Sequence, residues 1–590
     1  MNKDMNISLY NGSNSQNNCN NSNISNNSNN NIFVDIYCSA DGKDGNKICS
    51  MEVVKGTPLS EIAGECKGML LYPAVAARVN NDIRELSYTL DMSYEEAWKV
   101  EFIDVTDEDG MRIYTRSLYF LLVKAVNDLY PNRKVKIMHS ISKGIYCEAE
   151  GAFEQADVEA IVYHMRELTS KQIPFVKRLL PSDEAIGFLK DSGRIDRFHA
   201  IEHRTKPYVT IYNCGGLDDY FYGYMVPHTG YLEKFTLTHY FPGLILRYPL
   251  RNDPEKMPPF VEQKKLFDIF YEFKNWLTIL EMENIGALND IIKAGRIGEF
   301  IRISEALQEK RLAMIADVIS KNDPLPIVFI SGPSSSGKTT FSKRLSIQLR
   351  VNGLKPHIIS LDDYFVSRDK TPRDENGDFD YESVDAIDVP LFNSHLALLR
   401  EGREVDIPVF DFISGSRKDK GYSFSLGNGH VLIIEGIHAL NERISASVPR
   451  EEKLKLYVSA LTSMNIDDHN RIPSTDTRLL RRMVRDNRIR GIDPASTLKR
   501  WPSVRRGEEK YIFPYQEDAD IMFNSALLYE FSILKTFAEP QLQKISKDMR
   551  EYSEARRLLE FLSYFLEADA GEVPPNSILR EFIGNCCFID

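Results

Sequence analysis

Residues 326–341 read Pro-Ile-Val-Phe-Ile-Ser-Gly-Pro-Ser-Ser-Ser-Gly-Lys-Thr-Thr-Phe, and this segment decides the fold around it. It begins with a short apolar run, which is typical of a buried parallel strand. The phosphate-loop pattern G-x-x-x-x-G-K-[ST] follows, filled by Gly332, Gly337, Lys338 and Thr339. Apolar residues then recur as in a helix with one buried face. This order predicts a site for a nucleoside triphosphate rather than an ordinary glycine turn.

The residue types explain how such a loop binds phosphate. Glycines let the backbone curl so that its N–H groups point inward, and the following helix N-terminus adds partial positive charge. Lys338 would reach the β- and γ-phosphates, and the Thr339 hydroxyl would hold Mg²⁺. We expect the whole loop to bind the nucleotide, namely Gly332, Pro333, Ser334, Ser335, Ser336, Gly337, Lys338, Thr339 and Thr340.

Length and composition limit the class of protein. A chain of 590 residues is too long for one hydrophobic core, so three or four domains are expected. Its net charge of −12 argues against a stable nucleic-acid partner. The eight cysteines form no C-x-x-C pair, and no apolar run approaches the ~18 residues that span a bilayer. We expect a cytoplasmic protein with no membrane partner, and a homo-oligomer is left open.

The pattern along the chain predicts a multidomain protein that combines α/β and α+β parts. Asn and Ser dominate the N-terminus, a composition that cannot bury enough apolar surface to fold. Strand and helix patterns alternate in the phosphate-loop region, which implies a parallel sheet. The expected segments are a disordered tail at 1–31, an α+β module at 32–106, a mixed region at 107–250, a helical linker at 251–322, the phosphate-loop domain at 323–535 and a C-terminal helical segment at 536–590.

Acidic residues end two further apolar strand patterns in this domain. Asp362 and Asp363 end the first, and Glu435 ends the second. Ligands bind at the carboxyl ends of strands in open α/β sheets. Acids there can also be simple turn caps, but a phosphate loop in the same domain favours a catalytic site. Glu435 resembles a Walker-B acid that coordinates Mg²⁺ directly or through water.

A cluster of arginines follows. Spacing of i, i+3, i+4 and i+7 places four of them on one helix face: Arg478, Arg481, Arg482 and Arg485. One interpretation is a solvated basic face. The other is a mobile lid whose guanidinium groups neutralise charge on a transferred phosphoryl group.

The stretch from about 325 to 525 resembles the uridine–cytidine kinase family, within the larger group that includes phosphoribulokinase and pantothenate kinase. The matching segments, in order, are Gly332-Pro-Ser-Ser-Ser-Gly-Lys-Thr, Ser360-Leu-Asp-Asp-Tyr-Phe, Asp378-Phe-Asp-Tyr, Asp385-Ala-Ile-Asp, Ile407-Pro-Val-Phe-Asp-Phe-Ile-Ser-Gly-Ser-Arg, Ile434-Glu-Gly-Ile and Asp476-Thr-Arg-Leu-Leu-Arg-Arg-Met-Val-Arg-Asp. The resemblance implies a P-loop nucleoside kinase that uses ATP and Mg²⁺ to phosphorylate the ribose 5′-hydroxyl.

The resemblance also implies roles for individual residues. Asp362 would be the general base, and Asp380 would bind ribose hydroxyls. The catalytic set it implies is Asp362, Lys338, Arg485 and Arg490, and the metal ligands would be Thr339 and Glu435. The expected substrate contacts are Asp380, Phe410, Arg417, Arg482 and Arg500.

The chain departs from this family in the base pocket. A tyrosine and a histidine that contact the pyrimidine in the family are Phe410 and Gly415 here, and a base-contacting glutamine is Arg500. Loss of hydrogen-bonding groups changes specificity strongly, because buried polar groups must be paired. We expect a wider, less polar pocket and a preference shifted toward purines such as inosine or guanosine.

Residues 32–250 resemble a different family. Leu71-Tyr-Pro-Ala-Val-Ala-Ala-Arg-Val-Asn-Asn and Gly110-Met-Arg-Ile-Tyr-Thr-Arg-Ser-Leu are similar to a TGS domain, a ubiquitin-like β-grasp module. The part that follows is similar to the second additional (editing) domain of threonyl-tRNA synthetase. The two pairs of site residues in that domain would be His139 with Lys143 and Tyr224 with His228. Because a lysine and a tyrosine replace two of the four groups, we expect no deacylase activity and leave a regulatory role open.

Two alternatives to a nucleoside kinase remain. One is a kinase of the same fold that acts on another small molecule, such as a sugar phosphate. The other is a non-catalytic regulator that binds RNA or nucleotides and only senses ATP. An intact Asp362 and the arginine cluster favour catalysis over sensing.

Overall fold

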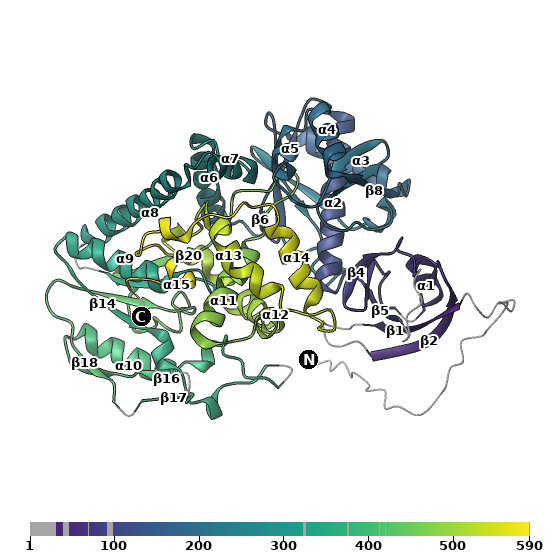
Figure 1. Cartoon of the computed structure of the whole chain (residues 1–590). Coiled ribbons are helices and arrows are strands. Elements are labelled where there is room, and N and C mark those ends of the chain that lie inside the picture. The colour runs from purple at the N-terminus through teal and green to yellow at the C-terminus, as the bar shows by residue number, and fades with distance from the viewer. Residues whose placement is uncertain are drawn as a thin grey trace.

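The computed structural model describes residues 31–38, 46–68, 70–90, 98–322, 326–374, 377–411, 414–418 and 420–588 (Figure 1). The tail expected at 1–31 lies outside these residues, except for Asn31 at the start of the first strand. Within the described ranges, no helix has both the length and the apolarity that crossing a bilayer requires.

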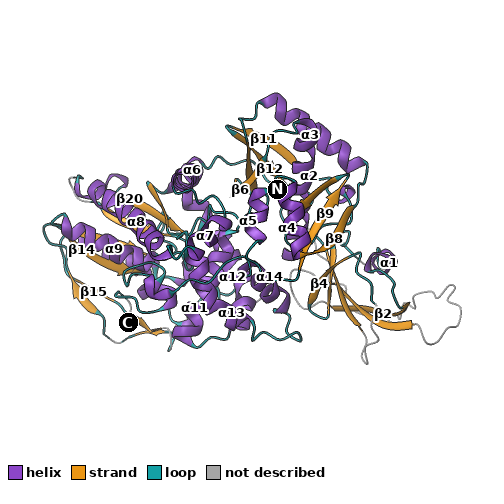
Figure 2. Ribbon diagram, turned by 45° about the horizontal axis from the view of Figure 1, so that its top comes forward, coloured by secondary structure: helices purple, strands orange, loops and turns teal. Residues whose placement is uncertain are grey.

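The first module is a mixed five-stranded sheet, ordered β2-β1-β5-β3-β4, with one short helix. Strands β1 and β5 pair in parallel, and the other neighbours are antiparallel. Figure 2 shows this module, with β2 and β4, at one side of the molecule. The elements are β1 (Asn31–Cys38), β2 (Asn46–Val54), α1 (Leu59–Glu65), β3 (Ala76–Val79), β4 (Asp82–Glu85) and β5 (Trp98–Ile103).

The second region contains two antiparallel sheets, ordered β10-β9-β8 and β11-β12-β7-β6. Its central helix α2 is preceded by Asp107, a typical N-cap whose side chain accepts from the backbone N–H groups of Asp109 and Gly110. The elements are α2 (Glu108–Leu129), β6 (Val135–Ile141), β7 (Gly144–Ala149), α3 (Gln155–Ser170), β8 (Phe175–Pro181), α4 (Ser182–Asp191), α5 (Ile195–Ile201), β9 (Tyr208–Cys214), β10 (Leu217–Tyr220), β11 (Thr236–Tyr240) and β12 (Gly243–Arg247).

Three helices connect this region to the phosphate-loop domain: α6 (Lys264–Ile279), α7 (Ile285–Lys293) and α8 (Ile297–Ser320). Apolar residues of α8, including Leu312 and Ile319, pack against Val328 and Ile330 of the central strand. Helix α8 therefore covers one face of the parallel sheet, and Figure 2 shows it beside α9.

The phosphate-loop domain is built on a fully parallel sheet, ordered β14-β19-β13-β20-β21. The strands are β13 (Ile327–Ser331), β14 (Lys355–Ser360), β19 (His430–Glu435), β20 (Lys453–Ser459) and β21 (Ile521–Asn524). The helices are α9 (Lys338–Val351), α10 (Val389–Arg400), α11 (Ser474–Arg490), α12 (Pro494–Tyr511), α13 (Glu530–Leu542), α14 (Tyr552–Leu562) and α15 (Arg580–Ile583). The predicted fold class, α/β with α+β parts, is confirmed.

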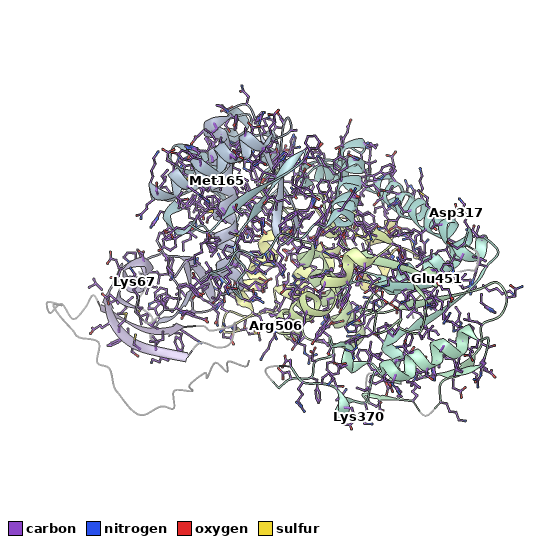
Figure 3. The ribbon with its side chains drawn as sticks, turned by 180° about the vertical axis from the view of Figure 1, so that it is seen from behind. Lys67, Met165, Asp317, Lys370, Glu451 and Arg506 are labelled. Atoms are coloured by element: carbon purple, nitrogen blue, oxygen red, sulfur yellow. The ribbon has the colours of Figure 1, made fainter. Side chains whose placement is uncertain are left out.

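The second region and the phosphate-loop domain, the two halves of the molecule, contact each other directly. The segment 460–473 between β20 and α11, which we call the docking loop, lies on the second region. There Ile137 donates its N–H to the Asp468 carbonyl (2.7 Å), and Asn465 donates to the Ile137 carbonyl (2.8 Å). His469 pairs with buried Asp219 (2.8 Å). In Figure 3, Met165 of the second region is labelled at the upper left and Lys370 of the phosphate-loop domain at the bottom.

Candidate functional site

The phosphate loop lies between β13 and α9, and at two of its positions the structure requires glycine. A Cβ on Gly332 would lie 1.9 Å from the Val458 carbonyl oxygen. Gly337 has a φ of 85°, in the left-handed region that favours glycine. Within the described structure, the hydroxyls of Ser335 and Ser336 are buried without a hydrogen-bond partner. Buried hydroxyls of the loop that have no partner could donate hydrogen bonds to the oxygens of a phosphate group.

Lys338 and Thr340 point to different sides of this loop. The Lys338 amine donates to the carbonyls of Gly332 (2.9 Å) and Pro333 (3.2 Å), so it lies across the loop it would serve. Burial lowers the pKa of Lys338, and the carboxylates of Glu435 and Asp362 act in the opposite direction. Thr340 instead donates its N–H (3.2 Å) and hydroxyl (2.7 Å) to Glu581. Its side chain therefore anchors the C-terminal segment.

The two residues expected to hold a metal lie together. The Thr339 hydroxyl is 3.5 Å from Glu435, whose carboxylate also accepts from Ser360 (3.3 Å). Burial raises the pKa of Glu435 to about 7, with a smaller contribution from the charge of Asp362. A carboxylate and a hydroxyl are hard oxygen donors, so this set fits Mg²⁺.

Asp362 and Asp363, adjacent after β14, have different surroundings. Asp363 accepts a hydrogen bond from the Phe410 backbone N–H (3.2 Å), so it holds the neighbouring strand. Asp362 is exposed to solvent, yet the surrounding protein raises its pKa by desolvation. The positive charges of Lys338, Arg490 and Arg485 act in the opposite direction. Asp362 is thus the carboxylate that faces the phosphate loop.

The arginines of α11 that the sequence places on one face fall into two groups with different contacts. Arg478 and Arg481 are buried and pair with Glu508 (2.8 Å) and Glu530 (2.7 Å). Arg478 also donates to the Ser334 carbonyl (3.2 Å). These two arginines hold the helix against the phosphate loop, so they form neither a solvated face nor a lid.

The other arginines of α11 converge on Asp486. Arg485 (2.9 Å), Arg482 (3.3 Å) and Arg490 (3.6 Å) all reach its carboxylate. Arg482 also donates to the Ser334 hydroxyl (2.8 Å). A single acid therefore gathers three cations at the edge of the loop, where phosphate oxygens would compete for them.

The expected substrate residues are more dispersed. Asp380 accepts a hydrogen bond from the Tyr511 hydroxyl (3.1 Å). Arg417 pairs with Phe410 in a two-residue ladder, and its guanidinium donates to Asp388 (3.2 Å) and to the Tyr364 carbonyl (2.9 Å). Arg500 is exposed on α12.

One expectation about the base pocket is corrected. Gly415 has a φ of 71°, and a Cβ there would lie 2.7 Å from Nε of Arg368. The Arg368 backbone N–H also donates to the Gly415 carbonyl (2.9 Å). The space expected to be wide and apolar at this position therefore holds a guanidinium group.

Several residues at the site were not predicted from the sequence. Glu382 has a buried carboxylate oxygen without a partner among the described residues, and burial raises its pKa to about 7. Glu508 and Glu581 contact the loop from distant segments, and no local pattern marks them. Asp486 could have been found, because it lies four residues after Arg482 on a helix.

The residues of the editing-like pairs contact different neighbours in the second region. His139 stacks on Phe270 of α6 with ring centroids 3.9 Å apart, and burial lowers its pKa to about 3. His228 caps a short 3₁₀ turn by accepting from the Gly230 N–H (3.2 Å). Beside Tyr224, the space is filled by Arg116, which donates to the Tyr224 carbonyl (2.9 Å).

Comparisons with known proteins match this chain to two different families. Residues 327–528 match the model of the Phosphoribulokinase / Uridine kinase family. A threonine–tRNA ligase from Fusobacterium nucleatum is 33% identical over 30% of this chain and 28% of its own length. One from Desulforamulus reducens is 31% identical over 33% and 30%. The chain thus spans under a third of these ligases.

Two solved structures are also similar. A putative fructose transport system kinase from Silicibacter sp. TM1040 is 19% identical, covering 36% of this chain and 98% of its own, with a TM-score of 0.27. A possible uridine kinase from Bacillus stearothermophilus is 19% identical with the same coverage and a TM-score of 0.26. From the family model, the phosphate-loop part is a P-loop kinase domain, and it is fused to a front half homologous to the synthetase editing region.

Proposed function

We propose that this chain is an ATP-dependent nucleoside kinase that transfers the γ-phosphoryl group to a ribose 5′-hydroxyl. The observation that carries the proposal is the position of Asp362, whose carboxylate faces Lys338 while its neighbour Asp363 is committed to the Phe410 backbone. A carboxylate beside the phosphate loop whose side chain makes no hydrogen bond to the described residues suits a general base. Desolvation raises the pKa of Asp362, which brings this pKa nearer to neutral pH and suits a group that accepts a proton during the reaction.

The remaining residues divide the work of phosphoryl transfer. Lys338 and the loop amides would bind the phosphates of ATP, and Thr339 and Glu435 would hold Mg²⁺. When bound, Mg²⁺ neutralises charge that develops on the phosphates. Arg485 and Arg490 would leave Asp486 to contact the transferred group, with Arg482 beside them.

For the acceptor, we propose a purine nucleoside, with inosine or guanosine preferred. Arg368 adds a donor-only side chain beside Gly415, and arginine pairs well with the O6 and N7 acceptors of a 6-oxopurine. Phe410 would pack against the base, Asp380 would bind ribose hydroxyls, and Arg417 would fix the strand that carries Phe410. We place this reaction in the cytoplasm, where its substrates are.

A second candidate is a kinase for a sugar phosphate. The guanidinium of Arg368 lies on the acceptor side, and the charge of Lys418 acts on Asp363 nearby. Two cations around an acceptor pocket favour an anionic substrate as well as a purine.

One assay separates these candidates. Purified protein with ATP and Mg²⁺ is tested against inosine, guanosine, adenosine, uridine, cytidine and several sugar phosphates, and kcat/KM is compared. We expect the highest value for a 6-oxopurine nucleoside. A clear preference for a sugar phosphate would replace the nucleoside proposal, and strong discrimination for uridine would refute the purine assignment alone. Hydrolysis of ATP without any acceptor would contradict both.

A further inference from the structure

A second group of chemically active side chains lies outside the kinase cleft, where α5 of the second region meets α7. His199, Glu202 and His203 are spaced as H-x-x-E-H at the end of α5, and Asp290 faces them from α7. Helix α7 approaches closely because residue 286 is glycine: a Cβ there would lie 2.4 Å from the His199 Cβ. The four side chains therefore bridge two parts of the molecule.

The distances within this group suit an ion. The His199 Nδ1 lies 3.5 Å from a Glu202 oxygen and 3.9 Å from an Asp290 oxygen, and the three ligand atoms lie within 4.8 Å of one another. The His203 Nε2 lies 3.4 Å from Asp290 and 4.0 Å from Glu202. A tetrahedral metal with bonds of about 2.1 Å separates its ligand atoms by about 3.4 Å.

The two imidazoles are only partly satisfied by protein groups, because His203 pairs through its Nε2 with Asp290 (3.4 Å) while the His199 Nδ1 is left unpaired among the described residues. Within the described part of the chain, the His199 Nδ1 is a buried nitrogen without a hydrogen bond, although two carboxylates face it. The His203 side chain is only 4% exposed, and its Nε2 is the nitrogen that faces Asp290 and Glu202. Unsatisfied buried nitrogens are uncommon and indicate a group that the protein itself does not supply.

A histidine elsewhere in the same region provides the contrast. His164 also faces two carboxylates, but its nitrogens lie 3.0 Å from Asp128 and 3.2 Å from Glu167, within direct hydrogen-bonding distance. Those pairs satisfy one another and leave no space between them. Around His199 the same chemical groups stand further apart.

We propose that His199, Glu202 and Asp290 bind one Zn²⁺ ion, with His203 as the fourth ligand. Two imidazoles and two carboxylates match the mixed nitrogen and oxygen ligands of zinc, whereas Mg²⁺ and Ca²⁺ prefer oxygen alone. Because the ligands come from α5 and α7, the ion joins the editing-like region to the helices that cover the kinase sheet. The site lies outside the phosphate loop and is independent of the proposed kinase activity.

The test measures zinc binding to the full-length chain without a polyhistidine tag. Protein stripped with a chelator is titrated with Zn²⁺ in excess Mg²⁺, and Co²⁺ is added separately to record the visible spectrum of a tetrahedral site. We expect one equivalent of zinc per chain and a higher Tm with zinc. Asp290→Asn and Glu202→Gln, both at partly exposed positions, should weaken binding at least about tenfold.

The control is His164→Ala, which removes an imidazole between two acids but should leave zinc binding and the zinc-dependent rise in Tm unchanged. His199→Ala and His203→Ala should each lose the tetrahedral Co²⁺ spectrum. Full zinc binding by Asp290→Asn and His199→Ala, or less than half an equivalent bound by the wild-type chain, would overturn the proposal. Neither outcome depends on phosphotransfer, so the kinase assignment stands or falls separately.

Discussion

Polar groups of the phosphate loop lie unpaired among the described residues, whereas in the editing-like region the arginine beside Tyr224 is already hydrogen-bonded. Among the described residues, Ser335 and Ser336 keep unpaired hydroxyls, and the Lys338 amine donates to carbonyls of its own loop. Beside Tyr224, in contrast, Arg116 already donates to the backbone. Pre-organised groups that still lack a partner are typical of a working site. The comparison separates a site whose polar groups are open to a ligand from a region whose polar groups already bind one another.

The strongest test of this comparison is Asp362→Asn. Loss of a general base should lower kcat by about 10²- to 10⁴-fold while ATP binding is retained, because the loop and Lys338 are untouched. Steady-state kinetics and ATP titration measure the two effects. Asp363→Asn is the matched control, and we expect it to change stability more than kcat because Asp363 holds the Phe410 backbone. Near-normal kcat in Asp362→Asn would transfer the role of base to Asp363.

A somewhat smaller effect is expected for Lys338→Ala. Removing one cation from the phosphates should lower kcat by about 10²- to 10³-fold and weaken ATP binding as well. Lys343→Ala, an exposed position on the same helix, is the control and should behave as the wild type. Equal kinetics in the two variants would show that the loop does not serve catalysis.

The contact between the halves can be tested through Arg557. This arginine pairs with Asp476 at the start of α11 (2.7 Å) and with Glu554 (2.8 Å), which also binds Arg112 of the second region. Arg557→Ala leaves a buried acid unpaired and should cost roughly 3 kcal/mol, seen as a lower Tm. The adjacent Arg556→Ala breaks only an exposed pair with Asp82 and should cost less than about 1 kcal/mol. Similar losses from both would mean that α11 is not anchored here.

Over the tested range of pH 7 to 5, the smallest effect concerns His139. Burial lowers its pKa to about 3, so the unfolded chain binds a proton below pH 6.5 that the folded chain does not. Stability should therefore fall as the pH falls from 6.5 toward 3, by about 1.4 kcal/mol per pH unit from this group. His139→Phe should show a weaker fall in Tm between pH 7 and pH 5. An unchanged pH profile would indicate that the imidazole is not buried as a neutral group.

Much of the kinase domain could be predicted because its signals are local. The loop pattern is continuous in sequence, and parallel strands bring their carboxyl ends to one edge, which places Asp362 and Glu435 near Thr339. Helical spacing also places the arginines of α11 on one face. Helical spacing does not reveal that Arg478 pairs with Glu508 and Arg481 with Glu530. These pairs show that the two arginines hold the helix in place.

The remaining features depend on contacts between distant segments. Glu581 binds Thr340 across 241 positions, and nothing near either residue in sequence indicates this. Arg368 lies over Gly415 because two loops meet, which reversed the expected polarity of that part of the pocket. The sequence resemblance pairs His139 with Lys143, but His139 stacks on α6, which is more than a hundred residues away in sequence.

The docking loop has a consequence for the order in which the chain folds. Its partner on β6 lies 328 positions earlier, as the bond from Asn465 to Ile137 shows. During synthesis the front half emerges first and folds before the docking loop exists, because domains generally fold from the N-terminus as the chain is made. The loop, and with it the start of α11, then closes onto a surface that is already formed. The front half therefore provides the folded surface on which the start of the arginine helix α11 is positioned.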